Sequence, residues 1–183
     1  FVNKLDRMGA DFYKDLDSIH ERLTKDAHPI QLPIGTEADF KGIVDLVKMK
    51  AYLYTDEMGT KFDEVEIPDD MMEKAKEYRA KLMEAVAETD EALMEKYLGG
   101  TELTEEELVK GIREATIKNM LYPVMCGSAL KNKGVQMLLD AIVAYLPAPT
   151  DVPPTEGHEP DNEESVVKVH ADDNEPLAAL AFK

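Results

Sequence analysis

Three polar residues near the amino end, Asn3, Lys4 and Asp6, place an amide, an ammonium group and a carboxylate in one short loop. A carboxylate accepts hydrogen bonds and donates none. Guanine presents two donors on one edge, N1–H and its exocyclic amino group, whereas adenine presents no such pair. Asp6 would therefore accept guanine and reject adenine, because the wrong base leaves a buried charge unpaired. Asn3 can link this loop to a neighbouring one, and the apolar stem of Lys4 can lie along the base.

A second loop with complementary groups lies much later in the chain, at residues 126–134 (CGSALKNKG). Ser128 can support the loop that carries Asp6. The backbone N–H of Ala129 can donate to the carbonyl oxygen of guanine, and Leu130 can cover one face of the ring. Each motif alone also fits a polar turn before a helix. Their shared placement, after a candidate strand and before an amphipathic helix, favours a guanine-specific pocket.

Both loops need strands and helices to position them. Ligands of open α/β sheets bind beyond the carboxyl ends of the strands, which is where these loops would lie. An apolar stripe predicts a helix over residues 10–26, and another predicts a helix from residue 135 that Pro147 ends. The first stripe consists of Phe12, Leu16, Ile19 and Leu23.

The spacing between the two loops predicts an insertion. From Asp6 to Ser128 the numbering advances by 122, whereas a strand–helix–strand unit needs only about 30 residues. We therefore expect an inserted α+β subdomain over roughly residues 28–118. Segments rich in Ile, Val, Leu and Tyr, broken by Gly and Pro, predict short strands from 29 to 67 with a hairpin turn at 56–59.

Acidic amphipathic helices are predicted for the remainder of this insertion. Asp70 with Glu73 forms a candidate capping pair for a long helix that breaks near residues 89–90. A second helix would end at the two glycines that follow residue 98. Thr104 with Glu107 matches a capping box and predicts a third helix to about residue 118.

The composition limits the classes of partner. The chain carries 38 acidic and 21 basic residues, a formal charge of −17. Such a surface repels phosphate backbones and anionic lipid, so we expect little direct nucleic-acid contact and a basic protein as partner. No stretch reaches the roughly 18 apolar residues of a membrane span. The single cysteine, Cys126, fits a reducing compartment and has no base placed beside it, and the four histidines lack metal-ligand spacing.

The region after the second loop's helix changes in character. Five of the ten prolines fall within residues 147–165, which predicts a linker. The segments VVKVH and LAALAFK then predict strands of a separate unit. Because the chain opens and closes within apolar stretches, we expect it to be an internal part of a longer protein.

These segments resemble the translational GTPase family, and within it the elongation factor G branch. The similarity covers essentially the whole chain through FVNKLDRMGADFY, PIQLPIG, FKGIVDLVKMKA, YPVMCGSALKNKGVQMLLDAIVAYLPAP and EPLAALAFK, in that order. Many GTPases carry Lys where this chain has Leu130. Ribosome-protection and release-factor GTPases remain open as related alternatives. The resemblance assigns base recognition to Asn3, Lys4 and Asp6 of an N-K-x-D box, and to Ser128, Ala129 and Leu130.

The resemblance also implies a domain organisation. The fold would be the C-terminal part of a P-loop GTPase-like, doubly wound α/β sheet with an inserted subdomain, followed by the start of a β-barrel domain. Residues 1–27 and 119–147 would belong to the GTP-binding domain and 28–118 to the insert. Residues 148–165 would form a linker, and 166–183 would begin the barrel. In this family the insert contacts the ribosomal stalk protein, and the parent is a cytoplasmic, ribosome-dependent GTPase that promotes translocation of tRNA and mRNA.

The sequence contains no G-x-x-x-x-G-K-[ST] phosphate-binding loop. Phosphoryl transfer depends on positioning the phosphates and Mg²⁺. We therefore expect the parent protein to bind GTP or GDP with Mg²⁺ and to hydrolyse GTP, with the metal ligands outside this chain. The chain alone is expected to be inactive. The alternative is an interaction module that binds basic ribosomal proteins and no nucleotide.

Overall fold

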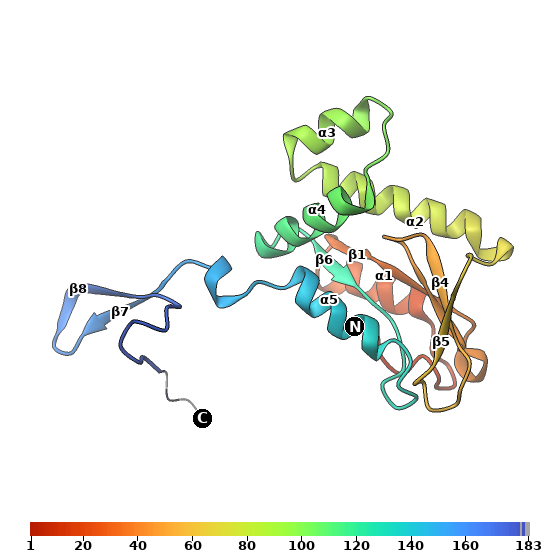
Figure 1. Ribbon diagram of the computed structural model, residues 1–183, viewed down its shortest axis with the longest axis horizontal. Coiled ribbons are helices and arrows are strands. Elements are labelled where there is room, and N and C mark those ends of the chain that lie inside the picture. The colour runs from red at the N-terminus through yellow and green to blue at the C-terminus, as the bar shows by residue number, and fades with distance from the viewer. Residues whose placement is uncertain (180, 182–183) are drawn as a thin grey trace. The chain divides into compact units, whose positions relative to one another are not determined.

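The computed structural model describes residues 1–179 and residue 181 (Figure 1). The chain divides into two compact units, residues 1–146 and residues 147–183. The first unit combines a parallel and an antiparallel sheet with five α-helices, so it is a mixed α/β structure. This agrees with the predicted class.

The parallel sheet of the first unit is short. β1 (Ala27–Pro29) pairs in parallel with β6 (Tyr122–Val124), and the amino end pairs in parallel just beyond β6. The carbonyl of Val124 accepts a hydrogen bond from the β1 side, whereas the carbonyl of Met125 accepts one from Val2. Successive carbonyls of an extended chain point to opposite sides, so β6 and its extension lie between the other two segments.

An antiparallel sheet follows β1 directly. The turn between its last two strands contains the predicted hairpin residues, and the side chain of Asp56 accepts hydrogen bonds there from the backbone of Thr60 and Lys61. The predicted start of the insert at residue 28 falls inside β1, whose pairing attaches it to the parallel sheet. In spatial order the strands are β2 (Gln31–Ile34), β3 (Gly42–Asp45), β4 (Lys50–Tyr54) and β5 (Phe62–Val65).

Two helices follow the two candidate base loops. α1 (Phe12–Arg22) begins after Asp11, whose side chain accepts hydrogen bonds from the first turn. It is shorter than the predicted helix over 10–26, and Leu23, predicted to lie on its apolar stripe, is 79% exposed beyond the helix end. α5 (Val135–Tyr145) begins after Gly134, which has φ +87°. This left-handed conformation favours glycine.

The acidic segment forms α2 (Asp69–Ala87), α3 (Glu91–Leu98) and α4 (Glu105–Ile117). The predicted capping box of α4 is confirmed, since Thr104 and Glu107 exchange side-chain-to-backbone hydrogen bonds. The Lys96 ammonium and these bonds lower the pKa of Glu107 to about 2. The predicted cap of α2 is wrong: the helix begins at Asp69 directly after a proline that makes no side-chain cap. Proline's fixed φ already suits a helix start.

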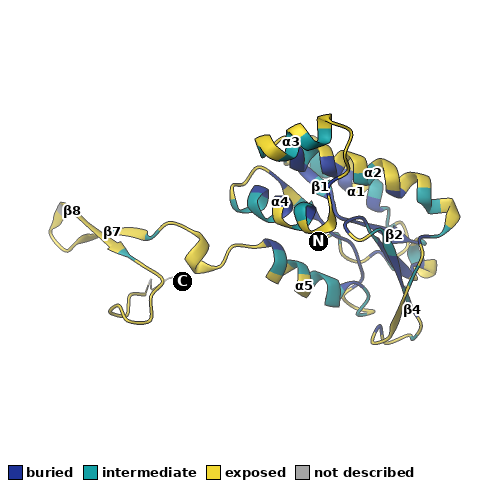
Figure 2. Cartoon of the chain, turned by 45° about the horizontal axis from the view of Figure 1, so that its top comes forward, coloured by how far each residue is buried: buried dark blue, intermediate teal, exposed yellow. Residues whose placement is uncertain are grey.

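One hydrophobic core joins the strands and helices of the first unit. α2 contacts β1, α3 and α4, and α4 contacts β6 and α5. α2 and α4 are buried along one face and exposed along the other, whereas α3 has only intermediate and exposed residues (Figure 2). In the described part of the chain, no helix combines the length and hydropathy needed to cross a membrane. Fully buried large side chains include Leu32, Ile43, Leu46, Leu82, Leu108, Ile112 and Leu121.

The second unit contains the hairpin of β7 (Thr155–Glu159) and β8 (Asn162–Val169) after a 3₁₀ turn at Pro149–Asp151. The predicted linker over 148–165 therefore includes β7 and the start of β8. The polar strand TEGHE carries little of the β-branched signal used for prediction, and backbone pairing with β8 defines it instead. Of the predicted strand LAALAFK, residues 177–179 and 181 have no strand structure, and the other positions lie outside the described residues.

Candidate functional site

The parallel pairing beside β6 brings the two candidate loops together. Val2 and Cys126 form a parallel bridge, and the N–H of Leu5 donates to the carbonyl of Gly127 at 3.2 Å. Both loops therefore leave the same end of neighbouring parallel segments, although they are far apart in sequence. This is the placement that the sequence predicted for the pocket.

A side-chain hydrogen bond joins the loops at their polar residues. The hydroxyl of Ser128 donates to Oδ1 of Asp6 at 2.6 Å, and Ser128 is completely buried. This bond lowers the pKa of Asp6, although partial burial of the carboxyl group opposes the shift. Asp6 is therefore an anion at neutral pH, held in one orientation by a buried neighbour. An oriented carboxylate can accept the two donors of a guanine edge.

Asn3 also links the loops, as the sequence suggested. Its Oδ1 accepts hydrogen bonds from the backbone N–H of Ala129 at 2.9 Å and from that of Lys4 at 2.8 Å. The N–H of Ala129 was expected to donate to a guanine carbonyl, but here it donates to Asn3. The same N–H would have to be released or shared to reach a base. Lys4 has φ +69°, a left-handed conformation that is uncommon outside glycine and often found at functional sites.

The residues expected to cover the base are accessible. Leu130 is 76% exposed at the tip of the second loop, and the side chain of Lys4 is exposed on the first. An isolated exposed leucine is ordinary on a protein surface. Here it lies one residue from the backbone donor and two from the serine that contacts Asp6.

Other contacts of the second loop were not predicted. The loop is closed by two backbone hydrogen bonds between Ser128 and Lys133, at 2.9 and 3.0 Å. Its far end is bonded to the antiparallel sheet through Tyr54, whose hydroxyl accepts from the N–H of Gly134 at 2.7 Å. Tyr54 and Gly134 are 80 positions apart, and neither residue carries a sequence signal for this pairing.

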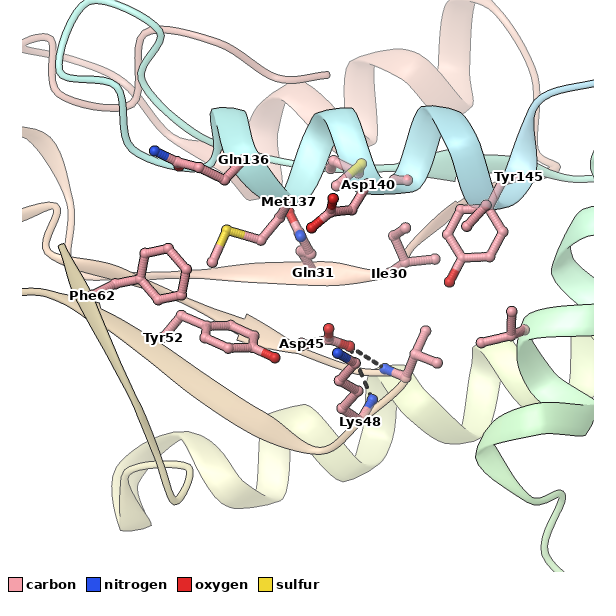
Figure 3. Close-up of a pocket in the computed structure, with 15 residues that line it drawn as sticks. Ile30, Gln31, Asp45, Lys48, Tyr52, Phe62, Gln136, Met137, Asp140 and Tyr145 are labelled. Atoms are coloured by element: carbon pink, nitrogen blue, oxygen red, sulfur yellow. Dashed lines mark hydrogen bonds between the residues drawn. The ribbon is translucent and has the colours of Figure 1, made fainter. Parts of the chain in front are cut away.

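A cavity of about 400 Å³ lies between the antiparallel sheet and α5 (Figure 3). Oδ1 of Asp45 accepts there from the backbone of Val47 and Lys48, and burial raises the pKa of this carboxyl group. Gln31 also lines the cavity, and within the described structure its Oε1 is buried without a hydrogen-bond partner. The cavity is lined by residues other than those predicted to recognise a base.

The remaining candidate chemistry finds little support. Cys126 is fully buried, and burial raises the pKa of its thiol, so the sulfur stays protonated and unreactive at neutral pH. Among the residues that the structure describes, no group of three or more His, Cys, Asp or Glu could hold a metal ion.

Comparison with known proteins gives the same grouping. Residues 1–148 match the family model of the elongation factor Tu GTP binding domain. The chain belongs to the translational GTPases. A crystal structure of a protein from Thermus thermophilus matches with a TM-score of 0.72 and 38% sequence identity, over 84% of this chain and 23% of that one. The chain thus spans less than a quarter of the length of that protein.

Membership of the translational GTPases agrees with the mixed α/β fold of the first unit. The family binds guanine nucleotides. The match ends at residue 148, close to the division between the two compact units at residue 146. The family assignment therefore describes the first unit, including the antiparallel sheet and the acidic helices.

Proposed function

We propose that this chain is the guanine-recognition part of an elongation factor G, a ribosome-dependent GTPase that moves tRNA and mRNA on the ribosome in the cytoplasm. The observation that carries the proposal is the 2.6 Å hydrogen bond from Ser128 to Asp6. It joins the two loops into one site and orients the carboxylate that distinguishes guanine from adenine.

In the proposed complex, Asp6 accepts the N1–H and amino hydrogens of guanine, and the N–H of Ala129 donates to the guanine carbonyl oxygen. Asn3 then gives up its hydrogen bond from the N–H of Ala129, and the Ser128–Asp6 hydrogen bond keeps the two loops together. Leu130 and the stem of Lys4 cover the faces of the ring. Discrimination comes from the cost of leaving an oriented charge unpaired when another base enters.

The rest of the parent protein supplies the phosphate-binding loop, the switch regions and the Mg²⁺ ligands. In that protein, residues 1–27 and 119–147 complete a doubly wound GTP-binding domain around the insert, and the second unit begins a β-barrel domain. Because phosphoryl transfer requires the phosphate and metal contacts, this chain alone hydrolyses no GTP. The residues encoded before Phe1 should therefore contain G-x-x-x-x-G-K-[ST].

The acidic helices are proposed to bind a basic partner, the ribosomal stalk protein by family resemblance. Residues 63–107 contain sixteen acidic and five basic residues. A dense cluster of negative charges raises the rate of association with a positively charged protein surface. The exposed carboxylates on and around the helices include Asp69, Asp70, Glu73, Glu77, Glu84, Glu88, Glu91, Glu95, Glu102, Glu105 and Glu106.

The test is Asp6→Asn in the complete protein, with GDP and xanthosine diphosphate as ligands in calorimetry. An amide turns one acceptor into a donor, so GDP affinity should fall by about 10³-fold or more. Xanthosine diphosphate carries a carbonyl where guanine carries its amino group, so its affinity should rise. Asp11→Asn is the matched control, since asparagine also caps a helix and Asp11 lies outside the pocket.

Two outcomes would contradict the proposal. An Asp6→Asn protein that still prefers GDP to both ADP and xanthosine diphosphate would place the base elsewhere. A wild-type parent that binds no guanine nucleotide would favour the alternative of an interaction module that acts without nucleotide.

A further inference from the structure

The second base loop, which contacts Asp6 through Ser128, also contacts the insert. The hydroxyl of Tyr54, at the end of β4, accepts from the backbone N–H of Gly134 at 2.7 Å and donates to Oε1 of Gln136 at 3.1 Å. Tyr54 is only 9% exposed. Because the bond to Gly134 is buried, water cannot replace the hydroxyl readily.

The turn between β4 and β5 makes a second connection to the same loop. The carbonyl of Gly59 accepts from Nδ2 of Asn132 at 3.1 Å and from Nε2 of Gln136 at 2.9 Å. Gly59 has φ +63°, and a Cβ atom there would lie 2.2 Å from the carbonyl oxygen of Lys131. The turn and the loop therefore pack backbone against backbone, which only glycine allows.

The segment between β2 and β3 contacts the second base loop and the turn that follows the first. Nζ of Lys133 donates to the carbonyl of Phe40 at 2.9 Å. The N–H of Gly9, just after the first base loop, donates to the carboxylate of Glu37 at 2.8 Å. Three separate stretches of the insert thus contact the second base loop or residues next to the two loops, all from the antiparallel sheet and its turns.

We propose that Tyr54 is a positioning residue for guanine recognition, through which the insert sets how long a guanine nucleotide stays bound. This inference rests on the proposed function. Tyr54 fixes Gly134, and the paired backbone bonds between Ser128 and Lys133 make the loop one rigid turn. A shift at Gly134 therefore moves Ser128, whose hydroxyl orients Asp6.

The test is Tyr54→Phe in the complete protein, which removes one hydroxyl and leaves the N–H of Gly134 unpaired. Dissociation of N-methylanthraniloyl-GDP, followed by stopped-flow fluorescence, should become about two- to tenfold faster, as expected for one lost hydrogen bond. Tyr52→Phe is the matched control. It removes the same atom from the same strand, and Tyr52 faces the cavity rather than the loop, so the rate should change by less than about twofold.

A second readout separates positioning from general stability. Inosine diphosphate lacks the amino group that Asp6 is proposed to bind, so a misplaced Asp6 weakens GDP more than it weakens inosine diphosphate. Tyr54→Phe should therefore lower the ratio of the two affinities, whereas a change in stability alone would leave the ratio constant. If Tyr54→Phe does not fold, Gln136→Met replaces it. This variant loses the hydrogen bonds to Tyr54 and Gly59 from a partly exposed position. It should raise the dissociation rate and lower the affinity ratio, as expected for Tyr54→Phe.

The inference fails if folded Tyr54→Phe matches Tyr52→Phe in both dissociation rate and affinity ratio. It also fails if Gln136→Met, used in its place, matches wild type. Neither result bears on the proposed function, which Asp6→Asn tests independently. Conversely, an Asp6→Asn protein that keeps its preference for guanine overturns the proposed function whatever Tyr54 does.

Discussion

The two parts of the insert contact the rest of the molecule in different ways. The antiparallel sheet reaches the second base loop through directional hydrogen bonds from Tyr54 and Gly59. The helices α2–α4 contribute apolar side chains such as Leu108 and Ile112, which are completely buried, and turn their carboxylates outward. One inserted region therefore contains a polar contact to the proposed site and an apolar contribution to the core.

Because of this difference, mutations in the two parts should have different effects, on the stability of the unit and on the retention of nucleotide. Apolar burial is non-directional and adds to the stability of the whole unit. A hydrogen bond to a loop fixes the position of a few atoms and contributes little net free energy. Changes in the helical part should therefore alter stability alone, whereas changes at the sheet contact should alter retention of the nucleotide in addition to any loss of stability.

The largest expected effect on stability is that of Leu108→Ala in α4. Leu108 is 0% exposed, so its truncation leaves a cavity and should lower the free energy of unfolding by about 2–5 kcal/mol. Urea denaturation followed by circular dichroism measures this loss. The exposed Leu98 provides the control, since Leu98→Ala should stay within about 0.5 kcal/mol of wild type.

Leu108→Ala also tests whether the two parts of the insert act separately on nucleotide release, when the complete protein is studied below its unfolding transition. The folded variant should release N-methylanthraniloyl-GDP at the wild-type rate, unlike Tyr54→Phe. A faster release from Leu108→Ala would show that the helices and the base loop are coupled, and the two parts of the insert would no longer be distinguishable.

A smaller effect of opposite sign is expected at Gln31, on β2. Its buried Oε1 has no partner in the described structure, and such a group costs about 1–3 kcal/mol. Gln31→Met keeps the length of the side chain and removes the unpaired group, so the unfolding free energy should rise by about 1 kcal/mol. Gln136→Met is the contrasting variant, because both ends of that amide are bonded, and it should lose stability. A loss in both variants would contradict the interpretation of Gln31.

The smallest effect concerns pH and His28, a half-buried residue of β1. Burial and the nearby His20 lower its pKa from an ordinary value of 6.5. Between the two pKa values the unfolded chain binds a proton that the folded chain does not, so stability rises with pH across that window and levels off above it. Lowering the pH from about 7.5 to about 5.5 should therefore destabilise wild type more than His28→Gln.

The pH dependence attributed to His28 needs a control histidine outside the first unit. His158→Gln alters an exposed histidine of the second unit and should leave the pH profile of the first unit unchanged. Equal pH dependence in wild type and His28→Gln would show that burial does not suppress protonation of this imidazole. Asp26 and Glu88 oppose the shift electrostatically and limit its size.

Local signals in the sequence predicted local structure well. The capping box of Thr104 and Glu107 needs only four consecutive residues, and α4 begins where it indicates. The same reasoning was wrong at Asp70 and Glu73, because the preceding proline already sets the helix start. It also overextended α1 to include Leu23, which the fold leaves in solvent.

The candidate site likewise has features that the sequence predicted and contacts that it did not. The residue types of Asn3, Asp6 and Ser128, and their positions after apolar strands, were enough to predict two loops that meet and a carboxylate suited to guanine. No pattern along the chain predicts that the N–H of Ala129 donates to Asn3, or that Tyr54 reaches Gly134. Such pairs depend on where separate strands come to lie.

The order of polar and apolar residues along the chain was therefore sufficient to predict the mixed α/β class of fold, and it favoured an insertion and a guanine-binding role for the two loops as hypotheses. These depend on periodicity, local capping and the hydrogen-bonding inventory of side chains. The packing of the insert sheet against the second loop was decided by the tertiary structure alone. Contacts across 80 positions arise from the register and twist of strands, which no local pattern encodes.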